Sequence, residues 1–116
     1  IIFRECECAA AATYTMNRVK AAPLYVTMEH LEDGVARAIV ANAGNANACA
    51  PDGMENARRM AKAAAQLLGV AETDVAVAST GVIGMQLPMD KLKASRSTFR
   101  SLNWRTMPPK RPTVPS

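Results

Sequence analysis

Aromatic residues are scarce in this 116-residue chain, which contains two Phe, two Tyr and one Trp. The apolar residues make up 49% of the chain and are therefore mostly Ala, Val, Leu, Ile and Met. Small apolar side chains bury little surface each, so the hydrophobic core has to be small. We expect a chain of this length to form one domain, or part of a larger one, with a thin margin of stability.

Histidine and cysteine are also few. His30 is the single histidine, and the cysteines are Cys6, Cys8 and Cys49. An odd number of cysteines argues against a disulfide framework, and these residues lack the four-ligand spacing of a structural zinc site. A Ser-His-Asp triad is not indicated, and no phosphate-binding or dinucleotide-binding glycine motif occurs. The sequence therefore predicts no metal, no resident cofactor and a reducing, cytoplasmic setting.

Long apolar runs are missing as well. No stretch reaches the roughly 18 apolar residues of a transmembrane helix. The first five residues are apolar and then charged, which reverses the order of a secretory signal. We expect neither a signal peptide nor a membrane partner. Because the chain does not begin with Met, we also expect further residues upstream.

Negative charge is absent from the last part of the chain. Residues 1–91 hold all 10 acidic residues and eight of the 14 basic ones, whereas residues 92–116 hold six basic residues and four of the seven prolines. This break predicts two segments. Residues 1–92 form an α/β segment, and residues 93–116 form a basic Pro/Arg/Ser tail that we expect to be disordered.

Two explanations of the tail remain open. Its charge could bind nucleic acid, but no recognition motif accompanies it, so we expect no nucleic-acid partner. Alternatively, a frameshift near Lys93 replaced the original continuation, because the codons around Trp104 and Met107 permit an acidic, Ala-rich reading in another frame. The nucleotide sequence distinguishes the two.

Hydrophobic periodicity indicates alternating strands and helices in the first 92 residues. Strands are predicted at residues 8–15, 36–42 and 75–78. A helix is predicted from Pro23 to a stop at residues 33–34, with a strand at residues 24–27 as the alternative. A final helix begins near Pro88. The order of elements predicts α/β layers, with helices on a sheet.

The longest predicted helix covers residues 53–68. Asp52 is placed as its N-cap, with Glu55 three residues on as in a capping box, and Gly69 as its C-terminal stop. One apolar stripe follows from spacings of three and four residues. Its members are Met54, Ala57, Ala61, Ala64 and Leu68. Arg58 and Arg59 are assigned to a solvated face.

Two loops are candidates for chemistry. Ser79, Thr80 and Gly81 follow the third predicted strand, where a hydroxyl and an open backbone N–H could stabilise an oxyanion. Residues 42–47 are rich in Asn and could hold an active-site loop in shape. Both compositions are also typical of ordinary turns.

Four motifs occur in a fixed order. They are Asn-Arg-Val-Lys-Ala-Ala-Pro at residues 17–23, Ala-Ile-Val-Ala-Asn-Ala-Gly-Asn-Ala-Asn-Ala-Cys at 38–49, Ala-Ser-Thr-Gly-Val-Ile-Gly at 78–84, and Leu-Pro-Met-Asp-Lys at 87–91. Together they resemble the ornithine/glutamate N-acetyltransferase family of arginine biosynthesis over about residues 9–92. Met16 stands where the family usually has Thr. Residues 1–8 match poorly, and nothing after Lys93 matches.

The resemblance implies the N-terminal part of a larger α/β enzyme that transfers acetyl from N-acetylornithine, or from acetyl-CoA as co-substrate, to glutamate. In the family a self-cleaved precursor exposes a threonine on the β chain, which carries the acetyl group, and the two chains form a heterotetramer. By motif, Thr80 and Gly81 stabilise the oxyanion. The family's Ala-Thr-Met-Leu nucleophile segment does not occur in this sequence, so the chain alone is predicted to be inactive. The alternatives are a basic nucleic-acid-binding module and an inactive scaffold.

Overall fold

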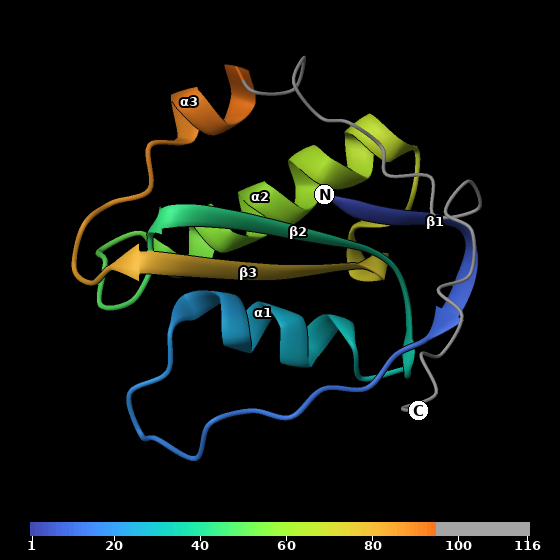
Figure 1. The fold of residues 1–116 in the computed structure, drawn as a ribbon, viewed down its shortest axis with the longest axis horizontal. Coiled ribbons are helices and arrows are strands. Elements are labelled where there is room, and N and C mark those ends of the chain that lie inside the picture. The colour runs from blue at the N-terminus through green and yellow to red at the C-terminus, as the bar shows by residue number, and fades with distance from the viewer. Residues whose placement is uncertain (95–116) are drawn as a thin grey trace, which may run out of the picture.

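The computed structural model describes residues 1–94, so nearly all of the predicted basic tail lies outside the described residues. In this part of the chain, three strands form one mixed sheet in the order β1 (Ile2–Ala9), β2 (Val35–Asn45) and β3 (Val75–Val82). β1 runs antiparallel to β2, and β2 runs parallel to β3 (Figure 1). The crossover between the parallel strands contains a helix, as such connections usually do.

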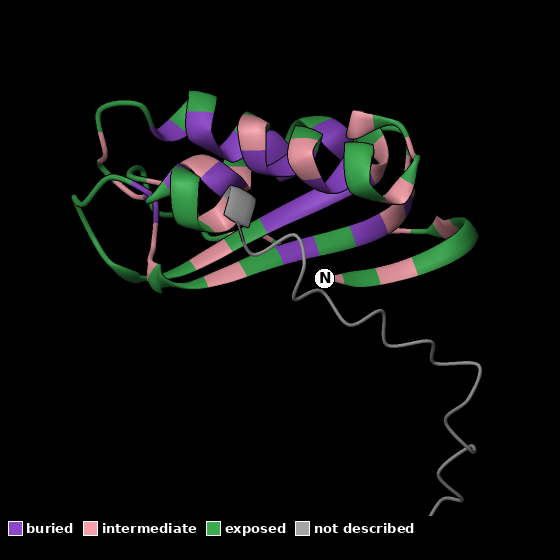
Figure 2. Cartoon of the chain, turned by 90° about the horizontal axis from the view of Figure 1, so that it is seen from above, coloured by how far each residue is buried: buried purple, intermediate pink, exposed green. Residues whose placement is uncertain are grey.

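Within the described residues, three α-helices accompany the sheet: α1 (Ala22–His30), α2 (Gly53–Leu68) and α3 (Met89–Ala94). A short 3-10 helix, Glu72–Asp74, leads into β3. Both α1 and α2 lie on the same face of the sheet (Figure 2). The predicted layering of helices on a sheet is confirmed, and within residues 1–94 no helix or strand covers the opposite face, which we call the open face.

The position of the first strand differs from the prediction. β1 ends at Ala9, and residues 10–21 contain no helix or strand, so the strand predicted at residues 8–15 is wrong. β1 is defined by its pairing with β2, in which Ile2 lies opposite Ile39 and Ala9 lies opposite Val35, with an irregularity between. The β-prone residues 13–15 have no neighbouring strand to pair with, and propensity alone does not make a strand.

α1 begins with Pro23 in its first turn, as predicted, and the alternative strand at residues 24–27 is wrong. Thr27 Oγ1 donates to the carbonyl oxygen of Val77 at 2.7 Å and accepts the Val77 N–H at 3.0 Å. His30 Nδ1 donates to the carbonyl oxygen of Val75 at 2.8 Å. The helix therefore occupies the outer edge of β3, where unpaired backbone groups would otherwise be exposed.

α2 has the predicted bounds, and Gly69 ends it with a φ of 68°. Asp52 is the N-cap residue, as predicted, but the capping box is wrong, because the Asp52 side chain makes no bond to the helix. The Asp52 carboxylate instead accepts a hydrogen bond from Gln86 Nε2 at 2.7 Å. Met54, predicted in the apolar stripe, is 40% exposed.

The core consists of small and medium side chains, as the composition predicted. It lies between the sheet and the two long helices, with contributions from the segment leading into α3. Its buried members are Val26, Ala38, Val40, Ala57, Met60, Ala61, Ala64, Ala65, Val75, Val77, Leu87 and Met89. On the solvated side, Arg58 forms an ion pair with Glu29 of α1 at 2.8 Å, and both side chains are about half exposed.

Candidate functional site

The two candidate loops lie side by side at one end of the sheet. Because β2 and β3 are parallel, their last residues meet at the same edge. Thr80 lies opposite Ala43, and Gly81 lies opposite Gly44. The Ser-Thr-Gly segment thus forms the last rungs of β3 rather than a turn after it, and the Asn-rich segment supports it from β2.

Gly81 has a backbone that other residues could not adopt here. Its φ is +129°, and a Cβ atom added to it would lie 2.3 Å from both the carbonyl carbon and the carbonyl oxygen of Gly44. Gly44 itself has a φ of +114°. The close approach of the two backbones therefore requires glycine at position 81, because no side chain fits between them.

The Thr80 side chain belongs to the open face. Ala38 and Val40 of β2 are buried under the helices, so the alternate residues Ala41 and Ala43 point the other way. Thr80 is the cross-strand partner of Ala43, and paired residues share a face. Thr80 is exposed, and with alanines as neighbours its hydroxyl is accessible to a group approaching from the open face.

Ser79 points to the helix side instead. Its Oγ donates a hydrogen bond of 2.5 Å to Oδ1 of Asn42, its partner across the two strands. The two consecutive hydroxyls therefore have different surroundings. The Ser79 hydroxyl is hydrogen-bonded to Asn42, whereas the Thr80 hydroxyl is exposed and makes no side-chain hydrogen bond within the described residues.

The asparagines of residues 42–47 all make backbone contacts. Each donates its side-chain N–H to a carbonyl oxygen: Asn42 to Asn45 at 3.0 Å, Asn45 to Gln86 at 3.4 Å and Asn47 to Gly53 at 2.9 Å. These bonds hold the segment in shape. Residues 42–45 belong to β2 rather than to a turn. The loop continues to Cys49, which has a positive φ of 55°.

Asn47 is the most buried of these residues, with 1% of its surface exposed. Its carbonyl oxygen accepts the Ala22 N–H at 3.1 Å, and its side chain holds Gly53, so it joins the first turns of α1 and α2. Sequence reasoning treated it only as part of a turn. Its φ of 52° is unusual for a residue with a side chain, but no sequence signal indicates its burial.

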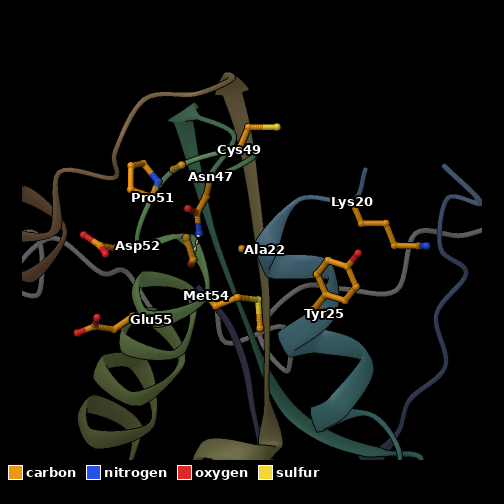
Figure 3. Close-up of a pocket in the computed structure, with 11 residues that line it drawn as sticks. Lys20, Ala22, Tyr25, Asn47, Cys49, Pro51, Asp52, Met54 and Glu55 are labelled. Atoms are coloured by element: carbon orange, nitrogen blue, oxygen red, sulfur yellow. Dashed lines mark hydrogen bonds between the residues drawn. The ribbon is translucent and has the colours of Figure 1, made fainter. Parts of the chain in front are cut away.

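A pocket of about 390 Å³ opens between the first turns of α1 and α2. Tyr25 and Lys20 lie on the α1 side, and Asp52 and Glu55 on the α2 side (Figure 3). Thr80 and Gly81 do not line this pocket. This pocket lies on the helix side of the sheet, whereas the Thr80 side chain lies on the open face.

We also searched the described residues for a metal site, a disulfide and a membrane-spanning helix. Residues 1–94 contain no group of three His, Cys, Asp or Glu side chains that could hold a metal ion. Cys6, Cys8 and Cys49 are free thiols, and the buried His30 is bonded to Val75. None of the helices in this region is long and apolar enough to cross a membrane.

Comparison with known proteins identifies the family. The family model described as the ArgJ family matches residues 1–107. The chain belongs to the ArgJ family. The arginine biosynthesis bifunctional protein ArgJ of Geobacter sulfurreducens is 48% identical over 94 residues, and the glutamate N-acetyltransferase of Methanothermobacter thermautotrophicus is 52% identical over 85 residues. These alignments cover 80% and 72% of this chain.

Solved structures of ArgJ proteins share the fold. The ArgJ structure from Bacillus halodurans superposes with a TM-score of 0.79 at 42% identity, over 81% of this chain and 50% of that one. The ornithine acetyltransferase of Mycobacterium tuberculosis, solved with ornithine, gives 0.76 at 43% identity, over 83% and 53%. The predicted α/β class and the resemblance to this family are both confirmed.

The extent of the match differs from the expectation at both ends. The ArgJ family match starts at residue 1 and includes residues 93–107, whereas the motifs suggested a likeness confined to residues 9–92. The chain spans 24% of the length of the Geobacter relative and 21% of the Methanothermobacter relative. About three quarters of those ArgJ-family proteins therefore has no counterpart in this chain.

Proposed function

We propose that this ArgJ-family chain supplies the oxyanion-stabilising segment of an acetyltransferase that moves acetyl from N-acetylornithine to glutamate in the cytoplasm, with acetyl-CoA as a further donor. The single observation that carries the proposal is the backbone at Gly81. Its φ of +129° and its contact with Gly44 hold the end of β3 in one conformation, beside an exposed Thr80 hydroxyl. Preorganised donors of this kind stabilise developing negative charge without reorganising during the reaction.

In this mechanism the nucleophile is a threonine on a partner β chain. Its hydroxyl oxygen forms a bond to the acetyl carbonyl carbon of N-acetylornithine, and the carbonyl oxygen becomes an oxyanion. The Thr80 hydroxyl and the Gly81 N–H donate hydrogen bonds to that oxygen. The proton of the attacking hydroxyl passes to the amide nitrogen, so collapse of the intermediate breaks the C–N bond and ornithine leaves with a free amine. The amine of glutamate then attacks the acetyl-threonine, the ester C–O bond breaks, and a proton from that amine returns to the threonine oxygen.

The open face supports this arrangement. Thr80 and its small neighbours Ala43 and Ala78 lie on the side of the sheet that no described element covers. A partner polypeptide can therefore bring a nucleophile to Thr80 without displacing α1 or α2. We propose that the β chain approaches from this side and that the two chains assemble as a heterotetramer.

The sequence contains no Ala-Thr-Met-Leu segment to act as nucleophile. We therefore expect the purified 116-residue chain to transfer no acetyl group from N-acetylornithine to glutamate. Transfer by the purified chain at a rate above that of buffer would contradict the assignment of the nucleophile to another polypeptide.

The test of the proposed role uses an active hybrid in which residues 9–92 of this chain replace the matching segment of Geobacter sulfurreducens ArgJ. Thr80→Val removes the hydroxyl and keeps the shape, and Thr80→Ser keeps the hydroxyl. We expect Thr80→Val to lower kcat about a hundredfold and Thr80→Ser to stay within about fivefold of the parent, a difference of about 1 kcal/mol in barrier. Thr73→Val, at another exposed threonine, is the matched control.

A further inference from the structure

Asn42 makes two hydrogen bonds that connect β3 to the backbone supporting Gly81. Its Oδ1 accepts the Ser79 hydroxyl proton at 2.5 Å, and its Nδ2 donates to the Asn45 carbonyl oxygen at 3.0 Å. The first bond crosses to the residue immediately before Thr80. The second spans Ala43 and Gly44, the residues paired with Thr80 and Gly81.

The segment beyond Gly81 is also held to the residues that follow β2. The Ala46 N–H donates to the Val82 carbonyl oxygen at 2.9 Å, and the Gly84 N–H donates to the Ala48 carbonyl oxygen at 2.8 Å. Thr80 and Gly81 thus lie between the Ser79–Asn42 bond on one side and these backbone bonds on the other. At Gly81 the Gly44 backbone lies so close that an added Cβ atom would be 2.3 Å from it.

We propose that Asn42 and Ser79 are positioning residues that fix the direction of the donors at Thr80 and Gly81. The proposal rests on the proposed function of that segment. A primary amide suits position 42 because one end accepts a proton from Ser79 while the other donates to Asn45. A carboxylate of the same shape would keep the first bond, but it would place negative charge against the Asn45 carbonyl oxygen.

The direct test measures the backbone amides of the complete 116-residue chain by ¹H–¹⁵N NMR and hydrogen exchange. In Asn42→Asp and Ser79→Ala we expect the Thr80 and Gly81 signals to shift and their exchange to rise about tenfold, as local opening becomes easier. Ser79→Thr, which keeps the hydroxyl, should restore the parental signals. The Val77 N–H, held by Thr27 at 3.0 Å, reports whether the rest of the sheet stays folded.

Asn17→Asp is the matched control, because Asn17 Oδ1 accepts the Val19 N–H at 3.2 Å in an exposed turn far along the sequence from β3. It should leave the Thr80 and Gly81 signals in place. If Asn42→Asp leaves those two signals and their exchange the same as Asn17→Asp does, the positioning role is wrong.

A kinetic cycle in the hybrid enzyme separates this inference from the proposed function. We expect Asn42→Asp to lower kcat about tenfold or more, with KM within about twofold, because misplaced donors weaken only the transition state. In a Thr80→Val background the same change should lower kcat less than about twofold further. If Thr80→Val lowers kcat about a hundredfold but Asn42→Asp leaves kcat unchanged, only the positioning role is wrong. If Thr80→Val leaves kcat unchanged, the proposed function itself is wrong.

Discussion

Gly44 and Gly81 face each other across the parallel strands β2 and β3, and their backbones approach so closely that a Cβ atom on Gly81 would lie 2.3 Å from Gly44. The relationship is not symmetrical. A Cβ atom on Gly44 would meet nothing within 4 Å, although Gly44 has a φ of +114°. Steric overlap therefore restricts position 81, whereas backbone conformation alone restricts position 44.

This asymmetry predicts different costs for two alanine substitutions. Gly44→Ala should lower the free energy of unfolding by about 1–2 kcal/mol, the cost of a strained backbone. Gly81→Ala should cost more, because overlap with the Gly44 backbone adds to the strain. Urea unfolding of the 116-residue chain, followed by circular dichroism, measures both. An equal or smaller effect of Gly81→Ala would contradict the close approach.

A second prediction concerns the edge of β3. Thr27→Val keeps the shape of the side chain but removes both hydrogen bonds to the Val77 backbone, which lie in a buried region. We expect a loss of about 1–3 kcal/mol in the free energy of unfolding, because buried polar groups lose their partners. Thr73→Val, at an exposed position, should change it by less than about 0.5 kcal/mol. Similar losses for the two variants would show that Thr27 does not hold the edge.

The open face predicts self-association of the isolated chain. Ile2 and Ile39 lie opposite each other on β1 and β2 and are 62% and 45% exposed. Uncovered apolar surface of this kind favours association. Ile39→Lys should lower the sedimentation coefficient at a given concentration, whereas Met16→Lys, at a 97% exposed residue outside the sheet, should not. A monomeric parent chain at the same concentration would contradict the prediction.

The sequence predicted the elements that local signals determine. The bounds of α2 follow from its periodic alanines and from Gly69, and the start of α1 follows from Pro23. β1 could not be placed in this way, because its position depends on pairing with β2. The position of Asp52 at the N-cap was predicted correctly, but its capping bond was not, because Gln86, distant in sequence, donates a hydrogen bond to its carboxylate.

In the candidate site, too, local sequence indicated the residues but not the contacts between them. Motifs pointed to Thr80 and Gly81, and composition pointed to the Asn-rich segment. The register of β2 and β3 could not be read from the sequence, and it is the register that brings Gly44 to Gly81 and Asn42 to Ser79. Likewise, only the fold shows that Thr80 lies on the open face while the pocket lies between the helices.

The most direct test of the central claim is the kcat for acetyl transfer from N-acetylornithine to glutamate by the hybrid ArgJ enzyme carrying Thr80→Val. We predict a kcat about a hundredfold below that of the parent hybrid, with near-parental rates for Thr80→Ser and Thr73→Val. A Thr80→Val enzyme that turns over as fast as its parent would contradict the claim that this segment stabilises the oxyanion.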